Sequence, residues 1–169
     1  QHNSGEVHGF KPLSLIDPSK DYTMPQPGGG TPLYDAAYSV LGATNAYAKD
    51  LVDQDFGVNA IVFIITDGGD TGSIATKKMV RDEARASVSG EVLESMISVL
   101  VGINTSSPGL LQMLQDFKDE AELTHFIDAN DATPGNLAKL AQFVSRSVSS
   151  QSQAMGTGGP SQNVSAATF

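Results

Sequence analysis

Residues 28–36 read Gly-Gly-Gly-Thr-Pro-Leu-Tyr-Asp-Ala, and this stretch decides where the first long helix begins. The glycine run lets the backbone turn tightly and approach a ligand closely. Thr31 is then a predicted helix N-cap, with Pro32 at the first helical position. From Pro32 to about Val52 the apolar residues recur with the period of an α-helix.

A second stretch, residues 61–70, reads Ile-Val-Phe-Ile-Ile-Thr-Asp-Gly-Gly-Asp. The continuous apolar run from Ala60 to Ile65 is typical of a strand that is covered on both faces in a parallel sheet. Asp67 follows this strand, and ligands of parallel α/β sheets gather beyond the carboxyl ends of the strands. We therefore expect Thr31 and Asp67 to meet at one rim of the sheet.

The rest of the chain alternates between helical and strand patterns. In chain order, the expected elements are a helix from Thr71 or Ser73 to about Val88, a strand from Glu94 or Ser95 to Ile103, a helix from Ser107, a strand from Leu123 to Ile127 and a helix from Thr133. This alternation predicts an α/β domain with a mostly parallel sheet flanked by helices.

The two ends of the chain do not follow this alternation. Residues 10–16 predict a short strand, at a sheet edge because of Pro12, and residues 17–21 predict a turn. Residues 151–169 are rich in Ser, Gln and Gly and carry no charge, which predicts a flexible tail. The expected organisation is one domain over residues 1–150 and a tail over residues 151–169.

Composition narrows the class of protein. The chain has 169 residues, enough for one domain with a sizeable core. Its net charge of −9, without a basic patch, argues against nucleic acid as the main partner. It has no cysteine, and therefore neither a disulfide framework nor a thiolate metal site. The longest apolar runs fall far short of a membrane span.

Thr31 and Asp67 are the candidate metal ligands. A hydroxyl, a carboxylate and water form an all-oxygen set, which suits Mg²⁺, Mn²⁺ or Ca²⁺ and disfavours zinc. Two simpler interpretations stay open at this point: Thr31 only caps its helix, and Asp67 only belongs to a Thr-Asp-Gly turn. Asp70 is expected to be a solvated turn residue, and the three histidines lack metal-ligand spacing.

Residues 29–36 followed by residues 64–68 resemble the von Willebrand factor type A domain, bacterial and phage-type members in particular. Residues 94–104, Glu-Ser-Met-Ile-Ser-Val-Leu-Val-Gly-Ile-Asn, are similar to the next strand of such members. The resemblance covers about residues 10–150. It implies a Rossmann-like fold with a metal-ion-dependent adhesion site, in which Thr31 and Asp67 are metal ligands. An acidic group of a partner protein often completes the coordination of the cation in this family.

One part of the family pattern is missing. The family's first loop, Asp-x-Ser-x-Ser, follows a buried first strand, and only about thirty residues precede Thr31 here. Asp17-Pro18-Ser19 begins similarly, but it lies only 14 residues before Thr31, without room for the intervening helix and hairpin. The domain is therefore expected to be N-terminally incomplete. Three explanations stay open: the chain opening on Gln1 is part of a longer protein, another chain completes the sheet, or this member lacks the metal site.

These observations predict a non-enzymatic protein-binding module with a divalent cation at the sheet rim. The cation, Mg²⁺ or else Mn²⁺ or Ca²⁺, would need residues beyond this chain segment. The alternative is a structural or assembly component of a virion or large complex, in which the metal site is incomplete or vestigial. An adaptor for an ATPase and a Mg²⁺-dependent hydrolase using Asp67 and Asp70 are weaker alternatives. A cytoplasmic or virion-associated location is favoured over secretion.

Overall fold

A single parallel sheet forms the centre of the computed structural model, which describes residues 7–22, 28–89, 93 and 95–156. Its strands, in the order β1-β2-β3, are β1 Asn59–Thr66, β2 Ser95–Gly102 and β3 His125–Asp128. Both strand pairs are parallel, and Phe63 lies opposite Val99, which in turn lies opposite His125. Each predicted strand from Ala60 onward is confirmed close to its predicted position.

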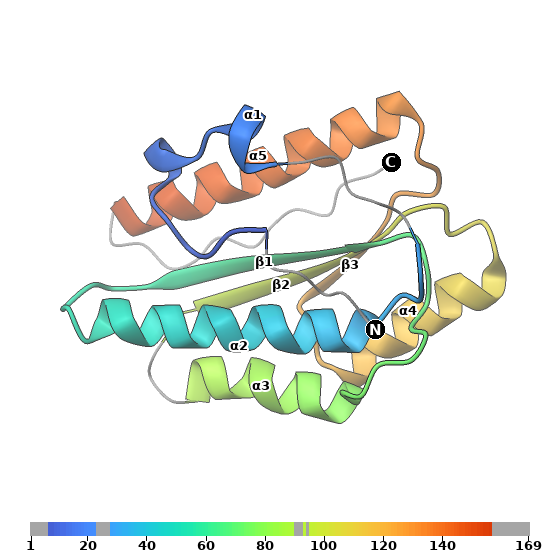
Figure 1. Cartoon of the computed structure of the whole chain (residues 1–169), viewed down its shortest axis with the longest axis horizontal. Coiled ribbons are helices and arrows are strands. Elements are labelled where there is room, and N and C mark those ends of the chain that lie inside the picture. The colour runs from blue at the N-terminus through green and yellow to red at the C-terminus, as the bar shows by residue number, and fades with distance from the viewer. Residues whose placement is uncertain (1–6, 23–27, 90–92, 94, 157–169) are drawn as a thin grey trace.

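Helices cover both faces of this sheet, so the expected α/β architecture is confirmed (Figure 1). The long helices are α2 Leu33–Val52, α3 Lys77–Ser89, α4 Pro108–Glu120 and α5 Pro134–Gly156. Helices α2, α3 and α4 lie on one face, and α5 lies on the other (Figure 1). Because α5 continues to Gly156, residues 151–156 are helical rather than part of a tail, and residues 157–169 lie outside the described residues.

Two hydrophobic cores hold the layers together. The larger core lies between the sheet and helices α2, α3 and α4, and the smaller one lies under α5. Strand β2 is fully buried from Ile97 onward, as expected of a central parallel strand. The sequence predicts that β1 is covered on both faces, but Ile65 on this strand is 51 % exposed.

The N-terminal segment differs from its prediction. Instead of a strand over residues 10–16, it forms the 3₁₀-helix η1 Leu13–Leu15, and the expected turn is the short helix α1 Pro18–Asp21. Pro12 lies within this stretch and removes a backbone donor that a strand would need. The segment contacts the domain through Phe10, whose ring stacks on Tyr47 of α2 at 4.7 Å between ring centroids.

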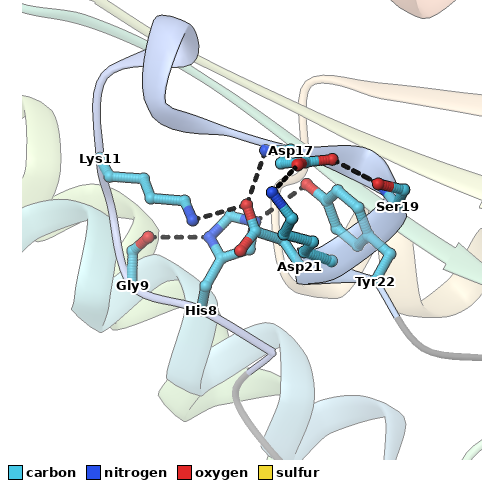
Figure 2. Close-up of polar contacts among 8 residues, drawn as sticks. His8, Gly9, Lys11, Asp17, Ser19, Asp21 and Tyr22 are labelled. Carbon is cyan, nitrogen blue, oxygen red and sulfur yellow. Dashed lines mark hydrogen bonds and ion pairs between the residues drawn. The ribbon is translucent and has the colours of Figure 1, made fainter.

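Polar contacts within this N-terminal segment connect its beginning to its end (Figure 2). The ammonium of Lys11 donates to Asp21 Oδ2 at 2.8 Å, and His8 Nε2 lies 2.9 Å from the hydroxyl of Tyr22. The hydrogen bond from Lys11 lowers the pKa of Asp21 below its ordinary value. A depressed carboxyl pKa means that the contact contributes stability above the unfolded-state pKa and loses it as the pH falls through the folded-state pKa.

We predict that Lys11→Gln raises the pKa of Asp21. Without the ammonium, the charged carboxylate loses its strongest partner and binds a proton more easily. An NMR titration of the Asp21 carboxyl carbon between pH 2 and pH 6 measures the two midpoints. Equal midpoints in the two proteins would show that Lys11 and Asp21 do not pair in solution.

We predict that Leu100→Ala lowers the free energy of unfolding by about 2–5 kcal/mol, because the cavity would lie in the centre of the larger core. Leu100 is completely buried in β2. Leu13→Ala is the matched control, since Leu13 is 82 % exposed and should change stability by about 0.5 kcal/mol or less. Urea denaturation measures both, and similar losses in the two variants would contradict this placement of the core.

Candidate functional site

The loops that carry Thr31 and Asp67 lie side by side at the carboxyl end of β1. The Thr71 N–H donates to the carbonyl of Thr31 at 2.8 Å, and the Thr31 N–H donates to Thr71 Oγ1 at 2.5 Å. A Cβ placed on Gly68 would lie 3.4 Å from Thr31 Oγ1, so the Thr31 hydroxyl is beside the residue that follows Asp67. The predicted meeting of the two loops at one rim is confirmed.

The glycine run is needed to reach Thr71. Gly29 has a φ of 89°, a conformation that L side chains rarely adopt. A Cβ on Gly30 would lie 3.0 Å from both the carbonyl oxygen and the hydroxyl of Thr71. The close approach that the glycine run permits is therefore an approach to the neighbouring loop of the same chain.

Thr31 does not cap helix α2, contrary to its prediction. The helix begins at Leu33, and Pro32 stands at the N-cap position, where it makes no side-chain cap. The Leu33 N–H instead donates to the backbone carbonyl of Thr31 at 2.8 Å and forms a tight turn. The Thr31 hydroxyl takes no part in this turn. Capping therefore does not account for the Thr31 side chain.

The caps of α2 come from the loop after β1. The Tyr34 N–H donates to Asp70 Oδ1 and to Ser73 Oγ, both at 3.1 Å, and the Asp35 N–H donates to Ser73 Oγ at 3.1 Å. These bonds satisfy N–H groups that have no partner within the helix. Asp70 is thus a part-buried capping residue rather than the solvated turn residue that the sequence suggested.

Asp35, in the first turn of α2, accepts hydrogen bonds from the loop after β1. Its Oδ1 accepts hydrogen bonds from the N–H groups of Ile74 at 3.0 Å and Ala75 at 2.7 Å. Residues 31–35 and 70–75 therefore bind each other in both directions, and we name this arrangement the clasp. The predicted cap of α3 by Thr71 or Ser73 is wrong because both side chains serve the clasp, and Thr76 Oγ1 accepts from the Met79 N–H instead.

Two side chains at this rim are left without a partner among the described residues. Neither the Thr31 hydroxyl nor the Asp67 carboxylate makes a hydrogen bond or ion pair there, and Asp67 is exposed. Their polar neighbours on the same loops are all engaged: Thr66, Asp70, Thr71 and Ser73. On the loops before α2 and after β1, the two residues predicted as metal ligands are therefore those whose side-chain oxygens have no partner among the described residues.

The other loops at this end of the sheet contact each other through polar side chains. The Thr105 hydroxyl donates to Asp128, and Asp128 Oδ1 also accepts from the Asn130 N–H at 2.8 Å. Asn104 Oδ1 accepts from the Ala132 N–H at 3.0 Å. These contacts hold the β2–α4 and β3–α5 loops together.

Thr31 and Asp67 fit a hard cation only in part. Mg²⁺ takes about six oxygen ligands, so these two side chains would leave about four positions to water or to other groups. Within residues 7–22, 28–89, 93 and 95–156, no group of three or more His, Asp or Glu side chains could hold a metal ion. His2 lies outside the described residues, and His8 is engaged by Gly9 and Tyr22.

No family model matches the chain, and neither a curated protein nor a solved structure is significantly similar to it.

Among the helices of the described residues, none has the length and hydrophobicity needed to cross a membrane.

We predict that Asp35→Ala destabilises the protein by about 1–3 kcal/mol, because two loop N–H groups lose their shared acceptor. Asp50→Ala on the exposed face of the same helix is the control and should change stability by about 0.5 kcal/mol or less. Thermal unfolding of both variants measures the difference. If the two variants unfolded alike, the reciprocal bonding of the clasp would be wrong.

Proposed function

We propose that the chain is a non-enzymatic protein-binding module that uses a divalent cation held at the sheet rim by Thr31 and Asp67. One observation carries this proposal: Thr31 in the clasp and Asp67 after β1 lie on two loops that contact each other at the rim, and the side-chain oxygens of both have no partner among the described residues. The resemblance of residues 29–36 and 64–68 to the von Willebrand factor type A domain supports the same pair. On those motifs we also propose that the α/β fold is of this type.

The proposed cation would be Mg²⁺, with Mn²⁺ or Ca²⁺ as substitutes, because both side chains offer hard oxygen donors. When bound, it would supply a positive charge with open coordination positions, to which a carboxylate of a partner protein can bind. The clasp would hold Thr31 beside Gly68, the residue that follows Asp67, and so keep the two loops of the proposed site together. With only two protein ligands, the isolated chain should bind metal weakly.

A binding role is better supported than hydrolysis. A hydrolase using both Asp67 and Asp70 would need the Asp70 carboxylate free at the rim. Asp70 Oδ1 instead accepts from the Tyr34 N–H and from the Ser73 hydroxyl. Recruiting Asp70 to a metal would uncap α2, at a cost of about 1 kcal/mol.

We predict that Mn²⁺ binds at this rim and that Asp67→Asn removes the binding. Paramagnetic Mn²⁺ broadens nearby amide NMR signals, so the signals of Thr31 and Gly68 should broaden first when the metal is titrated into the full chain. Thr31→Val, which removes the hydroxyl and keeps the shape, should weaken this broadening. The amide substitution at Asp67 should abolish it, because the negatively charged ligand is lost.

Asp55→Asn is the matched control for the metal titration. Asp55 is an exposed carboxylate beyond the opposite end of α2, and asparagine tolerates its positive φ of 65°. This variant should bind Mn²⁺ at the rim as the unchanged chain does. Broadening centred on Asp53 and Asp55, or unchanged broadening in Asp67→Asn, would refute the proposed metal site.

A further inference from the structure

Gly69, in the loop after β1, lies directly against a side chain of α4. A Cβ placed on Gly69 would overlap the sulfur of Met113, and it would lie 3.2 Å from the methyl carbon Cε of that residue. It would also lie 3.6 Å from Cδ1 of Leu110, one turn earlier in α4. The thioether of Met113 therefore occupies the space that a side chain at position 69 would need, and glycine permits this close approach.

Contact with Met113 means that the loop after β1 is held by two different elements. Gly68 is turned toward the segment before α2, since a Cβ there would lie 3.4 Å from Thr31 Oγ1. The next residue, Gly69, is turned toward Met113 of α4. Asp70 follows and caps α2 by accepting from the Tyr34 N–H. A displacement of Gly69 therefore acts on the neighbouring Asp70 cap and, through it, on the clasp.

Met113 is also open to solvent. It is 42 % exposed, whereas Leu114 beside it in α4 is completely buried in the larger core. Among the other methionines whose side chains the structure describes, Met96 is partly buried against that core and Met79 of α3 is 40 % exposed. Met79 is not among the atoms nearest to Gly69. Met113 thus combines access to a small oxidant with contact to the loop after β1.

We propose that Met113 is an oxidation site through which hydrogen peroxide loosens the loop after β1. A lone pair of the Met113 sulfur attacks one peroxide oxygen, the S–O bond forms and the O–O bond breaks. The sulfur is oxidised by two electrons to a sulfoxide, and the other peroxide oxygen is reduced and leaves as water. Methionine sulfoxide reductases reverse this modification, so the site can return to its original state.

Oxidation would remove the contact between Met113 and Gly69. The sulfoxide is larger and more polar than the thioether, and it no longer fits between Gly69 and the methyl group of Leu110. Because Met113 is half-exposed, its oxidised sulfur can turn to water, and Gly69 then loses the atoms that cover it. The adjacent bond from the Tyr34 N–H to Asp70 breaks more easily as a result.

This response does not depend on a metal. Asp67 lies on the same loop, so oxidation should also weaken Mn²⁺ binding at the rim. That consequence rests on the function proposed above, whereas the displacement of the loop can be measured in the presence of EDTA. Failure of the metal titration and failure of the oxidation experiment are therefore distinguishable.

Peroxide treatment of the full chain in EDTA tests the site. Peptide mass spectrometry should find one added oxygen on Met113 before Met96 is oxidised. The amide NMR signals of Gly68, Gly69 and Asp70 should then shift, and the Tyr34 amide should exchange at least about tenfold faster. Methionine sulfoxide reductase should restore the original spectrum. A Met113 that resists peroxide, or that is oxidised without these changes, would overturn the proposal.

Three variants assign the effect to the Met113 sulfur. Met113→Leu keeps a similar volume without a sulfur, so peroxide should leave its loop signals unmoved. Met79→Leu is the matched control, because Met79 is equally open to solvent, and this variant should respond to peroxide as the unchanged chain does. Met113→Gln places a polar group at the site permanently and should speed exchange of the Tyr34 amide without peroxide.

The opposite result in any of these variants contradicts the proposal. Peroxide-induced shifts of the loop signals in Met113→Leu, or their absence in Met79→Leu, would assign the effect to a different methionine. An unchanged exchange rate of the Tyr34 amide in Met113→Gln would show that a polar group at this position leaves the clasp intact.

Discussion

The clasp between the N-terminus of α2 and the loop after β1 is the constraint on which the rest of this rim depends. Four N–H groups of the two segments, those of Tyr34, Asp35, Ile74 and Ala75, are satisfied by side chains of the opposite segment. Each segment therefore needs the other to avoid leaving backbone donors unsatisfied. The position of Thr31 relative to Asp67 follows from this mutual dependence, together with the direct bonds between Thr31 and Thr71.

How much of the fold could be predicted depended on whether the signal was local. The apolar run at Ala60–Ile65 and the Thr133-Pro134 dipeptide act through neighbouring residues, and the structure has a strand and a helix start there. The caps of α2 come from residues 36 to 39 positions away in the chain, which no local pattern encodes. For this reason the sequence pattern does not indicate Asp70 and Ser73 as caps of α2 and favours Thr31, the nearest suitable side chain.

In the N-terminal segment, a local pattern predicted a strand that has no neighbouring strand to pair with among the described residues. Leu13, Leu15 and Ile16 have the composition of a strand, but a strand forms only where another strand accepts its hydrogen bonds. Leu13 and Leu15 are exposed, and the described contacts of this segment with the domain include the stacking of Phe10 on Tyr47 but no sheet pairing. Apolar composition indicated burial that this part of the chain does not achieve by itself.

Strand β1 connects the sheet to the rim. It ends at Thr66, directly before Asp67, and its parallel pairing with β2 fixes the point at which the acidic loop begins. The Thr66 hydroxyl donates to the Gly68 carbonyl at 2.7 Å, and the Gly68 N–H donates to Thr66 Oγ1 at 3.2 Å, so Thr66 holds the start of this loop in a tight turn. Gly68 in turn lies beside the Thr31 hydroxyl. The geometry of the proposed site therefore depends on the register of the sheet as well as on the clasp.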